Sequence, residues 1–269
     1  MNLILKVLGK REDGYHELAT LMQRISLCDE MIFIPRNRGI VLHCSEKTLP
    51  TDEGNIVVRA ARLFFDYIGW PEGIEITLQK KIPLAAGLGG GSSNAATTLL
   101  ALNEMTAAGI SRGKLMEMGV RLGADVPFFI FKETAWAFGV GERLQKAEGV
   151  PKLCFVLVNP GIELSTRRVY EGLKYGLTKQ PIQYNIPRLQ TVPQIIRGLH
   201  NDLEEVSEKI CPVIREIKDS MRAAGALGAL MSGSGATVFG ICANSEDAER
   251  AETEMREAGF PFVGTVHSL

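Results

Sequence analysis

A dense cluster of glycines is the feature of this sequence that most directly indicates chemistry. Residues 87–93 contain four glycines and two serines, and they precede an Ala- and Leu-rich stretch at 95–105 that is typical of a buried helix. Glycines lack Cβ atoms, so a phosphate can approach the backbone N–H groups closely, and a following helix adds unpaired N–H groups and the positive end of its dipole. The sequence therefore predicts a phosphate site made of Pro83, Leu84, Ala85, Ala86, Gly87, Leu88, Gly89, Gly90, Gly91, Ser92 and Ser93.

Two common nucleotide-binding patterns do not fit this segment. A Walker A loop ends in Gly-Lys-Ser/Thr, and no lysine follows these glycines. The dinucleotide pattern Gly-x-Gly-x-x-Gly, started at Gly87, would need a third glycine where Ser92 stands. A purely structural loop that only permits close helix packing is an alternative, although so many glycines would cost backbone entropy.

Two further places could contribute to such a site. Residues 231–239 form a second glycine-rich turn that leads into a strand, and Ser234 and Thr237 supply hydroxyl groups there. Asp125 stands in a Gly-Ala-Asp-Val-Pro stretch at the end of an expected helix. Taken alone, Asp125 would be a turn residue, but a carboxylate beside a transferable phosphoryl group can also accept a proton.

The elements that must position these residues mix strands and helices without regular alternation, which favours an α+β fold. Alternating and apolar runs predict strands at residues 3–8, 30–35, 39–44, 73–79, 134–138, 153–158 and 263–268. Helices are expected after the polar residues 51–55 and at 95–105, 111–122, 201–209, 213–224 and 244–258. We expect the strands at 30–35 and 39–44 to pair directly through the turn between them, and residues 178–193 to form a connecting loop.

Composition narrows the classes of function. The chain has 269 residues, 45% of them hydrophobic and 23% charged, with a formal net charge of −1, which argues against a nucleic-acid or membrane-surface binder. It contains neither an apolar run near the roughly 18 residues that span a membrane nor a signal-peptide pattern. The five cysteines include no Cys-x-x-Cys pair, so we expect no zinc site, no redox motif and no metal-ligating side chains, and a cytoplasmic protein with reduced thiols.

Both glycine-rich segments have counterparts in one known family. Residues 83–93 resemble the phosphate loop of the GHMP kinases (galactose, homoserine, mevalonate and phosphomevalonate kinases), and residues 231–239 resemble that family's third motif. The resemblance implies an ATP-dependent small-molecule kinase that uses Mg²⁺, with Ser234 and Thr237 near the nucleotide phosphates. It also implies a ribosomal-S5-like N-terminal domain at 1–150 and a ferredoxin-like C-terminal domain at 151–269.

The match continues at the N-terminus, where residues 9–18 resemble the segment of a family branch that phosphorylates a diphosphocytidyl sugar alcohol in the non-mevalonate isoprenoid route. Residues 55–61 and 123–127 match the same branch. The roles that the resemblance implies are general base for Asp125, sugar-alcohol contact for Asn2, cytidine contacts for Tyr15, His16 and Tyr170, and places near adenine for Asn55 and Lys80. Residues 201–204 resemble a recurring stretch of the family, and we interpret it as a helix start.

One residue of the family pattern is absent. The family carries a lysine two positions before the residue that Asn2 matches, whereas this chain begins at Met1. Lys6 shares a strand face with Asn2 but lies roughly 20 Å from the missing position, at about 3.3 Å per residue, which is too far for its side chain to span. We therefore expect a start site placed too far downstream, or a truncated chain, with weak kinase activity.

Two other functions stay open from the sequence. A non-catalytic sensor of nucleotide and sugar with the same fold would also lack the lysine, and ADP release would distinguish it from a kinase. A kinase of the mevalonate or homoserine type is the second alternative, although the Asp-Gly-Tyr-His run at 13–16 argues against it. The resemblance implies a monomer or homodimer, with a small-molecule substrate and neither nucleic acid nor membrane as a partner.

Overall fold

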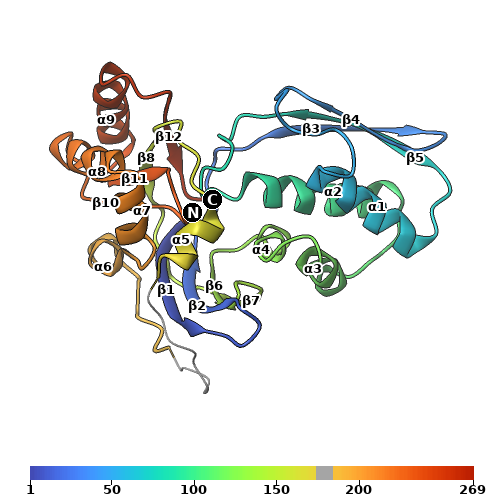
Figure 1. Cartoon of the computed structure of the whole chain (residues 1–269), viewed down its shortest axis with the longest axis horizontal. Coiled ribbons are helices and arrows are strands. Elements are labelled where there is room, and N and C mark those ends of the chain that lie inside the picture. The colour runs from blue at the N-terminus through green and yellow to red at the C-terminus, as the bar shows by residue number, and fades with distance from the viewer. Residues whose placement is uncertain (174–183) are drawn as a thin grey trace. The chain divides into compact units, whose positions relative to one another are not determined.

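The computed structural model describes residues 1–173 and 184–269, and its contacts divide the chain into two compact units (Figure 1). Unit 1 comprises Met1–Ser26, Pro83–Leu88 and Glu133–Leu269, and unit 2 comprises Leu27–Ile82 and Gly89–Lys132. Both units are discontinuous in sequence. The limits of the units do not coincide with the expected domain boundary at residue 150. The division into an N-terminal and a C-terminal family domain at that residue stays a prediction.

The first sheet of unit 1 has five strands in the order β7-β6-β2-β1-β9. The strands are β1 (Asn2–Lys10), β2 (His16–Met22), β6 (Ala135–Gly139), β7 (Arg143–Lys146) and β9 (His200–Asn201). Neighbours run antiparallel, except that the short β9 is parallel to β1. The turn between β1 and β2 is closed by the Arg11 N–H, which donates to the Tyr15 carbonyl at 2.8 Å, so His16 begins β2 directly after this turn.

The second sheet of unit 1 has four antiparallel strands in the order β10-β11-β8-β12. They are β8 (Cys154–Asn159), β10 (Gly228–Met231), β11 (Val238–Cys242) and β12 (Phe262–His267). Helix α8 (Val213–Ala223) packs on β10 and β11, and α9 (Ser245–Glu257) packs on β8 and β12. Counting these two helices, the chain order is βαββαβ, which is the predicted ferredoxin-like arrangement.

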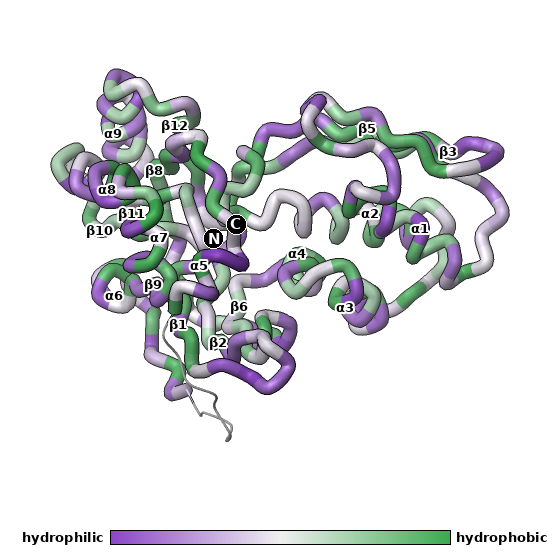
Figure 2. Tube along the Cα trace, viewed as in Figure 1, coloured by the Kyte–Doolittle hydropathy of each residue, from purple (hydrophilic) through white to green (hydrophobic). Residues whose placement is uncertain are grey.

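The core of unit 1 joins residues from both sheets. The inner strands β8 and β11 are buried almost throughout, so they are continuously apolar in sequence (Figure 2). Three short helices, α5 (Thr166–Glu171), α6 (Val192–Gly198) and α7 (Glu204–Ile210), lie between β8 and β10 in the chain. The predicted loop at 178–193 falls partly outside the described residues; from 184 to 190 it has neither helix nor strand, and α6 begins at Val192.

Unit 2 contains a three-stranded sheet in which one predicted pairing is wrong. Its strands are β3 (Glu30–Arg36), β4 (Ile40–Cys44) and β5 (Gly73–Gln79), in the order β3-β5-β4. β5 lies between the two strands that we expected to form a hairpin, antiparallel to β3 and parallel to β4. The backbone between β3 and β4 instead meets the start of β5, where the Ile74 N–H donates to the Gly39 carbonyl at 2.9 Å.

Four helices complete unit 2: α1 (Ile56–Ile68), α2 (Gly90–Met105), α3 (Arg112–Val120) and α4 (Val126–Phe131). Their apolar faces form one core with β4 and β5, which includes Phe64, Ile76 and Leu99. Helix α4 was not expected from the sequence, because Pro127 suggested only the end of the preceding helix; proline is tolerated in the first turn of a helix. No helix of the described part of the chain is long and apolar enough to cross a membrane.

A buried ion pair anchors the end of β5 just before the glycine-rich segment. The Asp29 carboxylate binds the Lys80 ammonium group and accepts from the N–H groups of Lys81 at 2.7 Å and Ile82 at 2.9 Å. The Asn94 amide donates to the same carboxylate at 2.9 Å. Desolvation opposes the charged carboxylate, but these donors outweigh it and lower the pKa of Asp29. The side chains of Asp29 and Lys80 are 1% and 8% exposed, so each depends on the other for its charge balance.

We expect Asp29→Asn to lower the free energy of unfolding by about 3–5 kcal/mol, because it leaves the Lys80 charge buried without its counter-charge. Urea unfolding at neutral pH measures this loss. The pKa of Asp29 is lowered, so its contribution is present above the ordinary aspartate pKa and is lost as pH falls through the lowered value. The difference between the two proteins should therefore shrink in acid. Glu30→Gln, which breaks the exposed pair with Lys81, should cost less than about 1 kcal/mol; an equal loss in both variants would contradict this role of Asp29.

Candidate active site

The glycine-rich segment is shared by the two units: Pro83–Leu88 belongs to unit 1 and the start of α2 to unit 2. Gly89 is the N-cap of α2 in the left-handed conformation (φ 69°), and no side chain caps this end of the helix. The first turn, which contains Gly90, Gly91 and Ser92, therefore presents backbone N–H groups at the positive end of a 16-residue helix. This arrangement can bind an anion, as the sequence predicted.

Packing around the glycines at the start of α2 is close. A Cβ on Gly89 would lie 3.0 Å from the Phe129 ring, and a Cβ on Gly90 would lie 3.1 Å from a methyl group of Ile82. A Cβ on Gly123 would lie 3.9 Å from the Ser92 hydroxyl, so the Gly-Ala-Asp turn borders the start of α2 within unit 2. The glycines that open the backbone to an anion thus also allow helix α2 to pack against α4 and the end of β5.

Asp125 occupies the N-cap position of α4, but its side chain caps no helix amide. The residue is exposed to solvent, and desolvation raises the pKa of Asp125. A carboxylate with a raised pKa is a stronger base than an ordinary aspartate. Asp125 and the first turn of α2 belong to the same compact unit, as the predicted roles of base and phosphate site require.

In unit 1 the two glycine-rich segments lie in contact. The Ser232 hydroxyl donates to the Gly87 carbonyl at 2.8 Å, and the Thr237 N–H donates to the Ala86 carbonyl at 3.3 Å. A Cβ on Gly87 would lie 2.2 Å from the Ser232 carbonyl oxygen, and Gly87 has a φ of 71°. The two segments, distant in sequence, therefore form one backbone surface whose close approach depends on glycine.

The hydroxyl groups predicted in the second glycine-rich turn are bonded within unit 1. The Asn159 amide donates to the Thr237 hydroxyl at 2.9 Å, and Thr237 is fully buried. The Ser234 hydroxyl lies 2.9 Å from that of Thr166 at the start of α5. Both residues lie in the turn that contacts residues 86 and 87, but the described contacts use these side chains to hold the turn.

His16 and Tyr170 come together in unit 1, as the resemblance implied for a base-binding site. Their ring centroids lie 5.1 Å apart, with 32° between the ring planes. Desolvation, followed by the charge of Lys10, lowers the pKa of His16, so the imidazole is neutral near pH 7 and offers one donor and one acceptor. Tyr15 is 64% exposed beside this pair, with its N–H bonded to the Asp13 carboxylate at 3.1 Å.

Asn2 lies on β1, near the second glycine-rich turn. Its amide nitrogen donates to the Thr20 hydroxyl at 2.8 Å, and Thr20 in turn donates to the Ile4 carbonyl. A Cβ on Gly233 would lie 3.6 Å from the Asn2 amide oxygen. Thr20, which the sequence did not single out, therefore orients the Asn2 amide, and the only available hint was its position on the neighbouring strand.

Asn55 and Lys80 are held by internal bonds of unit 2. The Asn55 carbonyl oxygen caps α1 by accepting from the Val57 N–H at 3.0 Å, and its amide donates to the Pro50 carbonyl at 2.8 Å. Lys80 is paired with Asp29 and also contacts the Asn94 oxygen at 3.3 Å. Their predicted places near adenine stay predictions, and Asp29 and Asn94 are partners that sequence reasoning missed.

We expect Gly87→Ala to lower the free energy of unfolding by roughly 1–3 kcal/mol, because the added methyl group would meet the Ser232 carbonyl and occupy a left-handed backbone. Urea unfolding measures the loss. Gly264→Ala in β12 is the matched control, since its nearest neighbour would lie 3.8 Å away. Unchanged stability of Gly87→Ala would mean that the two segments do not need their close approach.

Models of one known family match the regions that contain both glycine-rich segments. The family models for the N-terminal domain and the C-terminal domain of GHMP kinases match residues 55–133 and 183–260. A 4-diphosphocytidyl-2-C-methyl-D-erythritol kinase of Syntrophus aciditrophicus is 56% identical over 269 residues, which cover all of this chain and 96% of that protein. The protein of the same name from Syntrophotalea carbinolica is 52% identical over 95% of this chain and 91% of its own length.

Solved structures agree with these matches. A crystal structure of 4-(cytidine 5'-diphospho)-2C-methyl-D-erythritol kinase is 38% identical, with a TM-score of 0.82 over 98% of this chain and 96% of that one. A homoserine kinase from Cytophaga hutchinsonii, 22% identical with a TM-score of 0.71 over 93% and 88% of the two chains, shares the fold. With both family domains matched and relatives more than half identical along its length, this chain belongs to the GHMP kinase family.

Proposed function

We propose that this chain transfers the γ-phosphoryl group of ATP to the 2-hydroxyl of 4-diphosphocytidyl-2-C-methyl-D-erythritol. The relatives that bear the name of this kinase support the choice of substrate. The structural observation that carries it is the pairing of His16 with Tyr170, which places two aromatic rings of distant segments 5.1 Å apart beside the exposed Tyr15. We also propose a cytoplasmic location, consistent with the free cysteines of the described chain.

The phosphates of ATP would bind to backbone N–H groups of the glycine-rich segments. The first turn of α2 supplies N–H groups and the helix dipole, and the Ser92 and Ser93 hydroxyls lie in the same turn. Such donors stabilise phosphate oxygens without bringing an ordered side chain into the site. Glycine at positions 87, 89 and 90 is explained by close neighbours in each case.

Magnesium fits this site as a companion of the nucleotide. In the part of the chain that the structure describes, no three His, Cys, Asp or Glu side chains gather into a metal-binding group. We therefore expect phosphate oxygens, water and a serine hydroxyl at the start of α2 to hold the ion, since Mg²⁺ commonly keeps several waters. When bound, it would neutralise charge on the transferring phosphoryl group.

Asp125 would act as the general base. The oxygen of the substrate 2-hydroxyl forms the new bond to the γ-phosphorus while the bond from that phosphorus to the β–γ bridging oxygen breaks, and ADP leaves. The hydroxyl proton passes to the Asp125 carboxylate. Its raised pKa favours proton acceptance, and its solvent exposure leaves it accessible to a substrate.

The cytosine base would be recognised by stacking and by hydrogen bonds to its edge. Tyr170 and Tyr15 offer aromatic faces, and stacked aromatic groups are worth about 0.5–1.5 kcal/mol beyond their buried area. The neutral His16 offers a donor and an acceptor together, which a base edge can pair with. Neither a mevalonate nor a homoserine kinase would need this aromatic group, and those solved structures are only 10–22% identical to this chain.

We expect Asp125→Asn to lower kcat by roughly 10²–10⁴-fold, because an amide cannot accept the proton. ADP affinity should stay unchanged, since the N–H donors of α2 are untouched. Steady-state kinetics and calorimetric titration with ADP measure the two quantities. Asp66→Asn, an exposed aspartate on α1, is the matched control and should retain activity. Full activity of Asp125→Asn would rule out its role as base.

The pH dependence of kcat gives a second test of Asp125 as the general base. The base works when it is deprotonated, so kcat should fall as pH drops through a value above the ordinary aspartate pKa of about 3.9. The residual activity of Asp125→Asn should lack this acidic limb. A limb that persists unchanged in the variant would assign it to another group.

We expect His16→Ala to raise the KM for the diphosphocytidyl substrate by about tenfold, with the KM for ATP unchanged, because it removes the edge contact and the ring packed on Tyr170. Steady-state kinetics with each substrate varied in turn measure this. His43→Ala, an exposed histidine in unit 2, is the control. An equal rise in both KM values would indicate a general loss of structure instead.

A further inference from the structure

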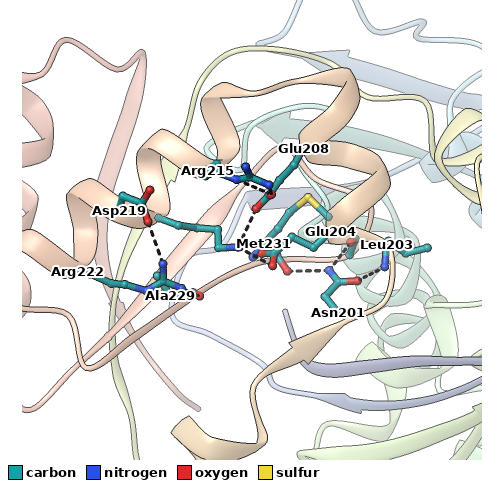
Figure 3. A network of polar contacts seen from close by, with 11 residues as sticks. Asn201, Leu203, Glu204, Glu208, Arg215, Asp219, Arg222, Ala229 and Met231 are labelled. Carbon is teal, nitrogen blue, oxygen red and sulfur yellow. Dashed lines mark hydrogen bonds and ion pairs between the residues drawn. The ribbon is translucent and has the colours of Figure 1, made fainter.

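Asn201, a buried residue outside the turn between β10 and β11, donates hydrogen bonds to the backbone of that turn (Figure 3). The Asn201 amide nitrogen donates to the carbonyl of Met231 at 2.9 Å and to that of Gly233 at 2.8 Å. Its carbonyl oxygen accepts from the Leu203 N–H at 3.0 Å. Both the nitrogen and the oxygen of this amide are therefore bonded, and a replacement must supply a double donor and an acceptor.

This contact revises the interpretation of residues 201–204 as a helix start. The N-cap of α7 is Leu203, and no side chain caps the helix. Asn201 is 7% exposed and lies on β9, one strand away from Asn2 on β1. Its side chain reaches across to the glycine-rich turn, so its contribution is to that turn as well as to the helix beside it.

A chain of alternating charges supports the same turn (Figure 3). The Glu204 carboxylate accepts from the Met231 N–H at 2.8 Å and pairs with Lys218 at 2.6 Å. Lys218 also pairs with Glu208 at 2.8 Å, and Glu208 accepts from Arg215. Two negative and two positive groups balance. A carboxylate can therefore hold Met231 without adding net negative charge beside an anion site.

The carbonyl contacts determine where the N–H groups of the turn point. In a planar trans peptide, the C=O and the following N–H point in opposite directions. Asn201 binds the Gly233 carbonyl, so the Ser234 N–H points away from Asn201. Among the described residues, no hydrogen bond uses the N–H groups of Gly233 or Ser234. Ser207 fixes the next peptide in the same manner, since its hydroxyl donates to the Ser234 carbonyl at 3.1 Å.

We propose that Asn201, together with Glu204 and Ser207, is a positioning residue that aims the N–H group of Ser234 at the phosphates of the nucleotide. The inference rests on the proposed function only in taking ATP as the ligand. It assigns nucleotide affinity to side chains that touch no phosphate themselves. Asn201 acts through the carbonyl groups that it holds, and Glu204 acts through the Met231 N–H.

Asn201→Asp tests the donor directly. The aspartate keeps the oxygen that accepts from Leu203 but loses both N–H bonds and places a carboxylate against two carbonyl oxygens. We expect the Kd for ADP, measured by calorimetric titration of the full chain, to rise at least tenfold. The KM for ATP should rise alike, while the KM of the diphosphocytidyl substrate stays unchanged. Asn244→Asp is the matched control, because Asn244 caps α9 through its oxygen alone, which aspartate also provides.

Ser207→Ala is the second variant, and it covers the case in which Asn201→Asp does not fold. It removes one donor to the turn with little change in volume, and we expect a two- to fivefold rise in the Kd for ADP. Each titration is made at a temperature well below the unfolding midpoint of the variant. A variant that is less stable but binds ADP with unchanged affinity would overturn the proposal, since a merely structural residue would behave so.

The outcomes separate this inference from the proposed function. Weaker ADP binding in both variants, with the control unchanged, supports the inference even if the diphosphocytidyl substrate were not phosphorylated. Turnover of that substrate together with unchanged ADP affinity in both variants would overturn the inference and leave the proposed function intact. An unmodified chain that bound no ADP would contradict both.

Discussion

The contact between Gly87 and the backbone of Ser232 is the constraint on which the arrangement of the two glycine-rich segments in unit 1 depends. It joins two segments far apart in sequence at a distance that no Cβ would allow. Each segment must then be supported from its other side. Residues 231–237 receive that support from β9 and α7, through Asn201, Glu204 and Ser207. The short elements between β8 and β10 thus contribute side chains that add to the turn's own hydrogen bonds, Ser232 N–H to Thr237 carbonyl and Gly235 N–H to Ser232 carbonyl.

The carboxylates that support the two glycine-rich segments share one feature, which is a lysine partner. Where a carboxylate supports a glycine-rich segment, a lysine neutralises it: Lys80 for Asp29 in unit 2, and Lys218 for Glu204 in unit 1. Asp125 differs, because desolvation raises the pKa of its carboxyl group. A paired carboxylate is a poor proton acceptor, since a neighbouring cation stabilises its charged form. Asp29, whose pKa is lowered, therefore keeps its charge, and the raised pKa of Asp125 supports its proposed role as the proton acceptor.

The sequence was most informative where local patterns decide the structure. Asn55 caps α1, the strands at 30–36, 73–79 and 154–159 lie where alternation and apolar runs predicted them, and glycines mark the close contacts. It failed where partners are distant. The hairpin of β3 with β4 was wrong because β5, which lies further along the chain, takes the place between them. The bonds of Asn201 to Met231 and Gly233 are likewise non-local, so the sequence predicted a helix start at 201–204 but not these contacts.

Non-local contacts also decide which groups of the candidate site stay available to a ligand. Side chains proposed near the nucleotide, such as those of Asn55, Lys80 and Thr237, bond to their own unit. The groups that stay available are backbone N–H groups, in the first turn of α2 and at Gly233 and Ser234. Backbone groups are the same in every residue, so a sequence can reveal them only through the glycines that make them accessible. The proposed phosphate site therefore depends on positions that lack side chains, and the polar residues around it would act by fixing the direction of the backbone.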